Sequence, residues 1–283
     1  MEFLDIPIVE DILLYIDPFL IANNRQVPIF NSMFLQVTDF FTTLNRNYIM
    51  PDDQVHGLDF LDSLHEPNEY HLGHSGANKG RAISNTRATT IYGALRNNRF
   101  TRAGAGVTNE AHNVLLLVGG IGQDIMSDTI ANVCRDLLAA FTLRQCNIHN
   151  IPTDRFRMHY YDIATTSWVT RDFDLPSYLG KPIILLPKGI ISSPRNYTGY
   201  FNGFIVRDYI VGEILSGAKP NPNDIFTRTM SNGSRRAIIK KILEVYRKPK
   251  PELVEFVLEY RDSLDRFLAY AREHYPALLS EFE

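Results

Sequence analysis

The sequence predicts an α/β (α+β) protein, in which a helix-rich domain surrounds a small mixed sheet and carries a C-terminal helical appendage. Apolar residues recur at helical spacing over residues 28–48. Two β-like segments, 156–163 and 167–173, are separated by a polar turn. After a break rich in proline and asparagine at 219–223, the remaining chain is again helical in pattern.

The composition is that of an ordinary globular protein. Of 283 residues, 45% are hydrophobic and 22% are charged, which excludes collagen-like, disulfide-scaffold and wholly disordered classes. No run approaches the ~18 apolar residues of a membrane span, and residues 1–20 carry five acids and no base, unlike a signal peptide. We therefore expect a cytoplasmic protein without a membrane partner, with an α/β core over 1–218 and a helical region over 223–283.

The first hundred residues predict one short strand followed by helices. The apolar run at 13–16 suits a buried strand, which Pro18 ends because proline cannot donate to a strand ladder. Helices are predicted over 28–48, 53–65 and 85–97, with a loop rich in Gly, Ser and Asn before the last of them.

The middle of the chain predicts a unit of strand, glycine turn and helix. The apolar run 114–118 is predicted as a strand that Gly119 and Gly120 stop, and a helix begins near Ser127. The two β-like segments follow. A third short strand is predicted over 182–186 and ends at a proline.

The C-terminal part is predicted to be helical. We expect a helix over 197–215, a basic helix from about Ser234 and a long amphipathic helix from about Pro251. The stripe of the last helix consists of Leu253, Val254, Val257, Leu258, Leu264, Phe267 and Leu268. Such a stripe either packs into the core of the same chain or seats in the groove of a partner.

Charge is segregated along the chain. The net charge of −3 resolves into −10 over residues 1–69, +6 over 70–109, 0 over 110–230, +6 over 231–250 and −5 over 251–283. Blocks of opposite sign either neutralise one another across the fold or leave the basic segments available to a phosphate backbone. The near-neutral total therefore does not exclude a nucleic-acid partner.

The first basic block is the predicted nucleic-acid-binding segment. Its bases are Lys79, Arg81, Arg87, Arg96, Arg99 and Arg102. Only Tyr92 and Phe100 interrupt the stretch, so it lacks the aromatic interleaving of a single-strand stacking platform and fits contacts to backbone phosphates better. A solvated helix face is the alternative interpretation.

Two carboxylates follow the glycine turn. The dinucleotide-binding fingerprint is not met, because Ile125 stands where the third glycine should be, and no Gly-Lys-Ser/Thr of a phosphate loop follows. Asp124 and Asp128 would repel a bare phosphate, which favours a divalent metal ion at this turn. Capping of the helix is the alternative role of both residues.

Three further residues complete the predicted site. Glu69 and Asp17 are the other expected ligands of one or two Mg²⁺ ions, beside Asp124 and Asp128. Lys188 follows a short apolar run and is expected to stabilise developing negative charge. The predicted catalytic residues are therefore Asp124, Asp128 and Lys188.

Several segments resemble one uncharacterised family of bacterial proteins that is associated with phage-defence and mobile-element gene neighbourhoods. The segments are YIDPFL at 15–20, Glu69 with LGHS at 72–75, GIGQDIMSD at 120–128, TLRQC at 142–146 with IP at 151–152, and IILLPK at 183–188. The order of Glu69, the aspartate pair and Lys188 is also loosely similar to divergent PD-(D/E)xK nucleases. Leu186 stands where that motif has an acid.

Two functions follow from these features. The first is a metal-dependent nuclease or phosphodiester hydrolase, with nucleic acid as its partner. The alternative is a non-catalytic structural or regulatory subunit of a multi-protein complex, which docks on a protein partner through its C-terminal helices. The resemblance implies a setting in bacterial anti-phage defence for both.

Overall fold

The computed structural model describes residues 2–5, 12–72, 82–217 and 225–277, the side chains of 82–85 excepted. The first part of the chain is built mainly from helices. The α-helices are α1 (Pro18–Asn23), α2 (Pro28–Leu44), α3 (Gln54–Asp62), α4 (Ala82–Asn97), α5 (Arg99–Arg102), α6 (Ala111–Leu117), α7 (Gln123–Val133) and α8 (Arg135–His149). The π turn η1 (Asn45–Ile49) and the 3₁₀ turns η2 (Asn68–Tyr70) and η3 (Gly106–Asn109) lie between them.

The strands of the described residues form separate two-stranded antiparallel sheets. The pairs are β1 (Tyr15–Ile16) with β6 (Ile191–Ser192), β2 (Asp154–Asp162) with β3 (Ser167–Leu175), β4 (Ser177–Tyr178) with β5 (Lys181–Pro182), and β7 (Thr227–Thr229) with β8 (Arg235–Ala237). The 3₁₀ turn η4 (Lys188–Ile190) precedes β6.

Helices α9 (Tyr197–Phe204) and α10 (Ile210–Leu215), joined by the π turn η5 (Ile205–Tyr209), begin the C-terminal region. Its remaining helical elements are α11 (Ile239–Tyr246), η6 (Lys250–Glu252), α12 (Leu253–Glu259) and α13 (Ser263–His274). The predicted α+β class with a C-terminal helical region is thereby confirmed. The predicted break at 219–223, and with it the boundary between the two predicted domains, lies outside the described residues.

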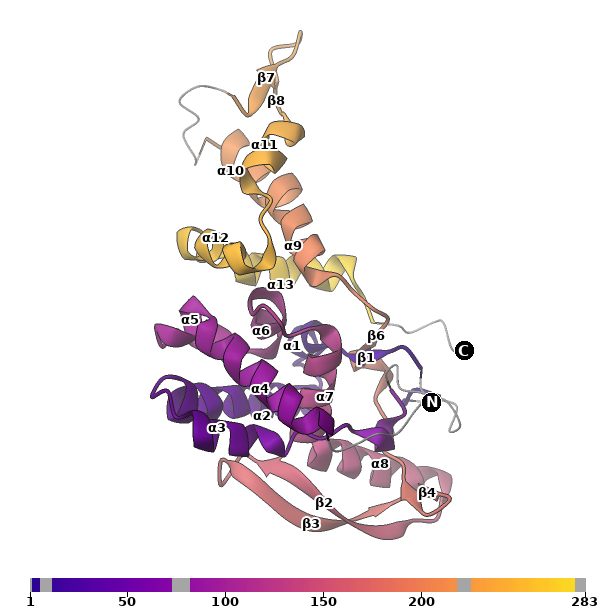
Figure 1. Cartoon of the computed structure of the whole chain (residues 1–283). Coiled ribbons are helices and arrows are strands. Elements are labelled where there is room, and N and C mark those ends of the chain that lie inside the picture. The colour runs from indigo at the N-terminus through magenta and orange to yellow at the C-terminus, as the bar shows by residue number, and fades with distance from the viewer. Residues whose placement is uncertain (1, 6–11, 73–81, 218–224, 278–283) are drawn as a thin grey trace.

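Figure 1 shows three levels in the molecule. Helices α1–α8 form the body, the long hairpin β2–β3 lies along one side of it, and α9–α13 form a layer on the opposite side. The small hairpin β7–β8 stands at the far end of that layer, away from the body. The hairpin β2–β3 and the hairpin β7–β8 therefore mark opposite ends of the protein.

Helix α2 is the central element of the body. It begins with Pro28, and its buried residues Phe30, Met33, Val37, Phe40 and Phe41 recur at the spacing that predicted it. The helix contacts α1, α6, α7, α8 and β2. A stripe this wide on a helix must be covered from several sides, and the body is built around it.

The run 114–118, predicted as a strand, belongs to helix α6. All residues from Ala111 to Leu117 are buried, so the helix has no polar face. A short apolar run without periodicity fits a buried strand and a buried helix equally well, and only the surrounding helices decide between them. The predicted unit of strand, turn and helix is thus a unit of helix, glycine turn and helix.

Other boundaries differ from the prediction. The helix expected from Ser127 begins at Gln123, so that Asp124 lies in its first turn, and it ends at Val133 before α8 begins. Of the strand predicted over 182–186, only Pro182 is paired. The amides of the next three residues donate to three different partners: the Pro176 and Glu69 carbonyl oxygens and the Thr142 hydroxyl.

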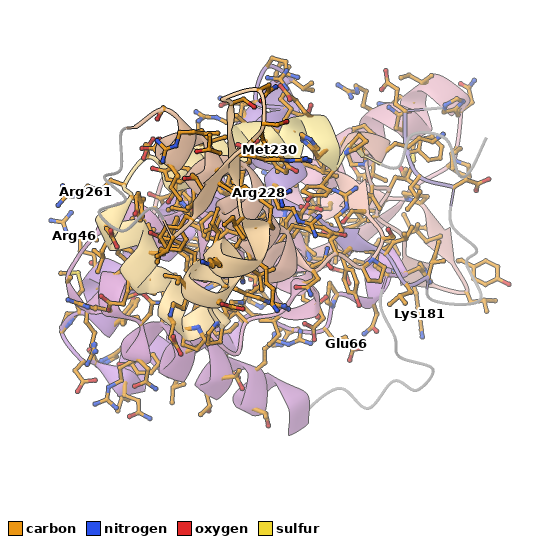
Figure 2. All side chains as sticks on the ribbon, turned by 90° about the horizontal axis from the view of Figure 1, so that it is seen from above. Arg46, Glu66, Lys181, Arg228, Met230 and Arg261 are labelled. Carbon is orange, nitrogen blue, oxygen red and sulfur yellow. The ribbon has the colours of Figure 1, made fainter. Side chains whose placement is uncertain are left out.

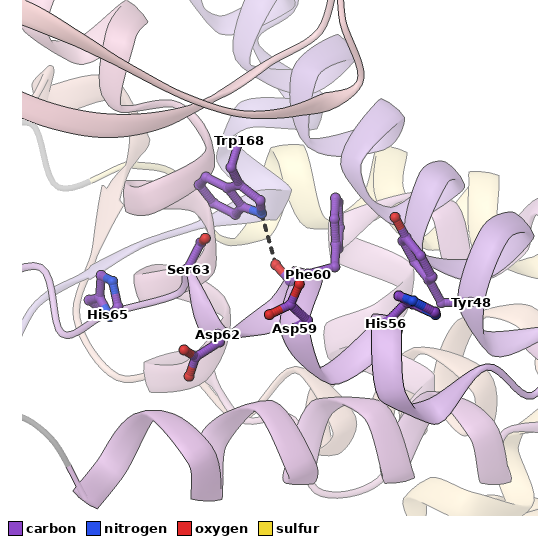
Figure 3. Close-up of a pocket in the computed structure, with 8 residues that line it drawn as sticks. All are labelled: Tyr48, His56, Asp59, Phe60, Asp62, Ser63, His65 and Trp168. Carbon is purple, nitrogen blue, oxygen red and sulfur yellow. Dashed lines mark hydrogen bonds between the residues drawn. The ribbon is translucent and has the colours of Figure 1, made fainter.

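The hairpin β2–β3 confirms the two predicted strands. Asp162 pairs with Ser167 at its turn, and Tyr161 pairs with Trp168 in the next register position. The Trp168 indole packs on α3 and donates a hydrogen bond to the Phe60 carbonyl oxygen at 2.8 Å, as Figure 3 shows. The Phe40 ring lies edge-on to the rings of Tyr161 and Trp168. These aromatic contacts fix the hairpin on the body.

The C-terminal layer is held together by aromatic rings. Phe201 of α9 contacts Phe256 of α12 and Phe267 of α13, with ring centroids 6.2 and 4.9 Å apart. Phe267 also lies edge-on to Phe19 of α1. Much of the predicted apolar stripe is therefore buried within the chain itself: Leu253, Val254, Val257, Leu264 and Phe267.

Two elements of the C-terminal region differ from the prediction. The segment predicted as a basic helix from Ser234 begins as strand β8, and α11 starts only at Ile239. The predicted long helix from Pro251 is divided into α12 and α13 by residues 260–262.

Figure 2 shows the molecule from above, that is, from the side of the C-terminal layer. Arg228 and Met230 of the β7–β8 hairpin lie near the middle of the face seen in this view.

Gly57 marks the tightest contact between α3 and α4. A Cβ atom on Gly57 would lie 2.5 Å from Cε2 of the buried Tyr92 and 3.1 Å from the Tyr48 Cβ. We expect Gly57→Ala to lower the free energy of unfolding by roughly 1–3 kcal/mol, because overpacking outweighs the better helix propensity of alanine. Urea denaturation measures this change.

Gly93→Ala is the matched control on α4. Nothing lies within 4 Å of a Cβ atom there, so the alanine is expected to leave stability unchanged or raise it by up to about 1 kcal/mol. Equal effects of the two substitutions would contradict the close packing of α3 against α4.

Candidate functional site

Asp124 and Asp128 lie one turn apart on α7, because the helix begins earlier than predicted, and only one of them is enclosed. Asp124 is exposed in the first turn of the helix. The Asp128 side chain is 21% exposed and forms an ion pair with Arg87 of α4, with 2.8 Å between Oδ2 and Nη1. The predicted acid therefore meets a base that was predicted to bind nucleic acid.

The environment of Asp128 favours its neutral form. Burial raises the pKa of Asp128 to about 7; Arg87 opposes this shift, and the negative charges of Asp124 and Glu66 add to it. Asp124 and Asp128 together also raise the pKa of Tyr15, although burial of the Tyr15 hydroxyl is the larger cause. A carboxyl group that titrates near neutral pH is a candidate for proton transfer.

Glu69 is engaged in a buried ion pair. Its Oε1 accepts from Nε of Arg135 at 2.8 Å and lies 2.8 Å from Nη2, and the two side chains are 11% and 6% exposed. Arg135 also donates to the His159 carbonyl oxygen at 2.5 Å and to Asn132 Oδ1 at 2.8 Å. The pair joins η2, the start of α8 and β2. Breaking such a pair leaves an uncompensated buried charge, so its role is structural.

Asp17 is fully buried at the start of α1. Its Oδ1 accepts from the Phe19 amide at 2.9 Å, and the Tyr197 hydroxyl donates to Oδ2 at 2.7 Å. The Arg195 guanidinium lies 3.5 Å from the same oxygen. Burial raises the pKa of Asp17, and these hydrogen bonds and the charge of Arg195 oppose the shift.

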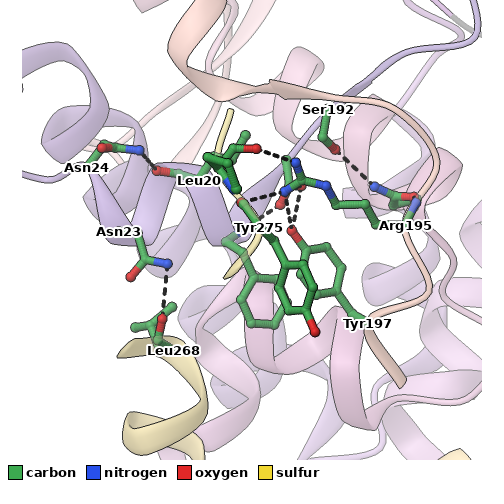
Figure 4. Close-up of polar contacts among 12 residues, drawn as sticks. Leu20, Asn23, Asn24, Ser192, Arg195, Tyr197, Leu268 and Tyr275 are labelled. Carbon is green, nitrogen blue, oxygen red and sulfur yellow. Dashed lines mark hydrogen bonds and ion pairs between the residues drawn. The ribbon is translucent and has the colours of Figure 1, made fainter. Parts of the chain in front are cut away.

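Arg195 extends this network to the end of the C-terminal layer. It donates to the carbonyl oxygen of Tyr275 at 2.8 Å and to that of Pro276. Figure 4 shows Arg195 directed toward Tyr197 and Tyr275. Asp17 thus caps a helix and holds a structural network, and its oxygens are turned to protein donors.

Lys188 is the first residue of η4. Its backbone amide donates to the Glu2 carbonyl oxygen at 3.2 Å. Within the described residues, its side chain forms no ion pair with Asp124 or Asp128. The predicted catalytic trio is therefore not joined by direct ion pairs, and its convergence stays a prediction.

The predicted Mg²⁺ ligands do not converge on one position. Glu69 and Asp17 are bound to Arg135 and to Tyr197, and Asp128 is paired with Arg87. Among the described residues, no group of three or more His, Cys, Asp or Glu side chains could hold a metal ion. These residues do not fit a shared ion, and a magnesium site stays a prediction.

The first basic block is largely paired with acids of the same chain. Besides Arg87 with Asp128, Arg96 pairs with Asp52 at 2.7 Å and Arg99 pairs with Glu255. Arg102 is exposed on α5. Lys79 and Arg81 lie outside the described residues. Acids of the two terminal acidic blocks thus pair with Arg96 and Arg99, and Asp128 of the middle of the chain pairs with Arg87.

The second basic block forms a surface at the far end of the molecule. In the hairpin β7–β8, Arg228 lies directly opposite Arg236. Both are exposed, as are Arg235, Lys240 and Lys241. Neither Arg228 nor Arg236 has an ion pair within residues 2–5, 12–72, 82–217 and 225–277. We call these five residues the basic tip.

Not all of the second basic block belongs to the basic tip. The Lys250 ammonium donates to the Ile121 carbonyl oxygen at 2.8 Å, and its burial lowers the pKa of Lys250 to about 8. Lys250 thereby ties the C-terminal region to the predicted glycine turn. The hairpin itself was missed in the sequence, although Asn232 and Gly233 between two short β-like segments are a turn signal.

Asp128 makes the stability of the protein depend on pH. Its pKa is about 7 in the folded chain against an ordinary value of 3.8, so the unfolded chain releases this proton first and the free energy of unfolding falls as pH rises through that interval. Asparagine does not titrate, so Asp128→Asn lacks this pH-dependent fall in the free energy of unfolding. The missing fall amounts to at most about 4 kcal/mol, at 1.36 kcal/mol per pKa unit. Urea denaturation at several pH values measures it.

Asp128→Asn also loses the ion pair with Arg87. This loss changes the free energy of unfolding of the variant wherever Asp128 is charged in the folded wild type. The diagnostic quantity is therefore the slope against pH, compared with that of the exposed variant Asp124→Asn. A slope that is as steep in Asp128→Asn as in the wild type would contradict the raised pKa.

Comparison with known proteins identifies a family without assigning a function. No described helix has the length and apolar character needed to cross a membrane. No curated protein and no solved structure matches the chain. One family profile, the domain of unknown function DUF8370, matches residues 1–198, which end in the first turn of α9. The chain belongs to the DUF8370 family.

Proposed function

We propose that this protein binds nucleic acid through the phosphate backbone, at the basic tip formed by β7–β8 and α11. The observation that carries the proposal is the cross-strand pair of Arg228 and Arg236. Like charges directly opposite each other destabilise a hairpin. A phosphate group placed between the two guanidinium groups removes that repulsion and accepts hydrogen bonds from both.

The surroundings of the pair favour a polyanion over a single anion. Residues 225–250 contain eight basic side chains and one acid, Glu244. Lys240 and Lys241 are exposed at the start of α11, and Arg235 is exposed on the other face of the hairpin, where it donates to the Thr227 hydroxyl at 2.9 Å. Together they add to the positive charge of this end of the molecule. Such a surface follows successive phosphates of a strand and makes affinity strongly dependent on salt.

The chemistry of the basic tip favours backbone binding over base reading. Short strands with Arg and Thr side chains supply hydrogen-bond donors to phosphate oxygens, which carry no sequence information. The described residues of the hairpin present no aromatic ring beside Arg228 and Arg236 on the paired strands, so stacking of bases is not expected there. Binding is therefore expected to be weakly selective for sequence.

The resemblance to proteins of phage-defence neighbourhoods supports a role in bacterial anti-phage defence. In that role the protein acts as a non-catalytic subunit that engages nucleic acid at one end. The surfaces of α11–α13 that lie outside the buried apolar stripe bind a protein partner in this proposal. This form of the proposal agrees with the burial of Leu253, Val257 and Phe267 inside the chain.

Removing the arginine pair tests the basic tip. We expect Arg228→Gln with Arg236→Gln to weaken binding to a fluorescein-labelled duplex or single strand about tenfold at low salt. The magnitude of the slope of log K against log salt should fall by about 1.4–1.8, since each of the two lost phosphate contacts accounts for about 0.7–0.9. Fluorescence anisotropy across a salt series measures both quantities.

Arg272→Gln is the matched control, since Arg272 is exposed on α13 away from the hairpin. Arg102→Gln tests, in the same assay, an exposed base of the first basic block that forms no ion pair within the described residues. The proposal is wrong if the wild-type protein does not bind DNA or RNA, or if the double variant binds with unchanged affinity and salt slope.

Phosphodiester hydrolysis is a second candidate, favoured by the acids of α7. Asp128, with its pKa raised to about 7 by burial, can exchange a proton near neutral pH. Arg87 lies beside it and supplies positive charge for a phosphate. Asp124 is exposed one turn earlier and is free to approach a ligand from solvent.

Hydrolysis is tested on labelled DNA and RNA with Mg²⁺ and with a chelator. We expect Asp128→Asn to abolish cleavage and Asp124→Asn to reduce it at least about tenfold, as for a lost group in acid–base catalysis. Glu273→Gln, an exposed acid on α13, is the control. Cleavage that persists in both aspartate variants, or that the wild type lacks, removes this second candidate and leaves the binding function standing.

A further inference from the structure

A pocket lies between α3 and the hairpin β2–β3, at the end of the molecule opposite the basic tip. It has a volume of about 420 Å³. That volume is in the range of sites for small ligands. Figure 3 shows its lining residues: Tyr48, His56, Asp59, Phe60, Asp62, Ser63, His65 and Trp168.

One side of the pocket is aromatic and rigid. The Trp168 indole is fixed by its hydrogen bond to the Phe60 carbonyl oxygen at 2.8 Å. The Phe60 ring is stacked on the Phe40 ring, and the centroids of the Tyr48 and Phe60 rings are 5.1 Å apart. Rings held in this way present a preformed surface to a planar or cationic group.

The polar side of the pocket is acidic. Asp59 and Asp62 are three residues apart on α3 and therefore lie on one face of the helix. The Asp59 carboxylate is exposed and has no hydrogen bond or ion pair in the described part of the chain. No Lys or Arg lines the pocket. A ligand that fits here carries positive charge.

The two histidines leave this sign unchanged. The pKa of His65 is lowered, mainly by desolvation, and this shift favours the neutral ring. His56 lies on the Asp53 carboxylate, with 2.8 Å between Nδ1 and Oδ2, so any positive charge on it is balanced within the pair. The pocket thus combines an aromatic wall, two carboxylates and neutral hydrogen-bonding groups.

We propose that this pocket binds a guanidinium group, either of a small alkylguanidine or of an arginine side chain in a protein segment. A guanidinium group is planar and weakly hydrated, stacks on aromatic faces and donates paired hydrogen bonds to carboxylates. A compact ammonium group is strongly hydrated and cannot stack in this way. This inference is independent of nucleic-acid binding at the basic tip.

Trp168 is the only tryptophan of the chain, so its fluorescence reports on this pocket alone. The full-length protein is titrated with agmatine, with a Gly-Gly-Arg-Gly-Gly peptide, and with putrescine as the ammonium probe. We expect a saturable change of Trp168 emission with both guanidinium probes and at least tenfold weaker binding of putrescine. A tighter-binding peptide identifies a protein segment as the source, and tighter-binding agmatine identifies a small molecule.

Asp59→Asn and Asp62→Asn each remove one carboxylate and should weaken guanidinium binding about tenfold, as expected for hydrogen bonds to charged groups. Glu273→Gln on α13 should leave it unchanged. Unchanged thermal midpoints show that the variants are folded. The proposal is overturned if no guanidinium probe gives a saturable response, if putrescine binds equally well, or if both aspartate variants bind like the wild type.

Discussion

The buried carboxylate of Asp17 is the constraint on which the arrangement of the chain depends. It caps α1 and lies beside the sheet β1–β6, whose strands are 175 or more residues apart in sequence. Its partners Tyr197 and Arg195 lead into α9, and Arg195 reaches the residues that follow α13. A buried charge that is shielded from water needs such partners. The network of Asp17 therefore holds the helical body and the C-terminal layer against each other.

The same rule accounts for the fate of the acidic and basic blocks. Glu69 meets Arg135, Asp128 meets Arg87, and Asp52 meets Arg96, each across a large separation in sequence. The exposed pair of Asp52 and Arg96 contributes little to stability, whereas the buried pair of Glu69 and Arg135 cannot be broken without a large loss. The two proposed binding sites lie at opposite ends of the molecule: a basic hairpin at one end and an acidic pocket at the other. Among the described residues, Arg228 and Arg236 of the hairpin and Asp59 of the pocket form no ion pair.

Predictions from sequence succeeded where periodicity was clear. The stripe of α2 and the segments that became β2 and β3 each bury one face, so their spacing reports the element directly. The run that became α6 is buried on all sides and therefore carries no such signal. The hairpin β7–β8 is short and polar, and its second strand falls where the sequence predicts a basic helix from about Ser234, because the charge pattern does not distinguish a strand from a helix. Of the predicted site, Asp124 and Asp128 are neighbours at the start of one helix, which begins at Gln123 and not near Ser127 as predicted, and their surroundings could not be predicted from the sequence.

The sequence by itself determined the helix-rich class, the main amphipathic elements and the segregation of charge, because these depend on residue spacing and composition within short stretches. Only the tertiary structure decided which charges pair. It turned Glu69 and Asp17 into structural residues, enclosed Asp128 and left Arg228 and Arg236 exposed. The physical reason is that pairing and desolvation depend on distances between residues far apart in the chain, which local patterns do not contain.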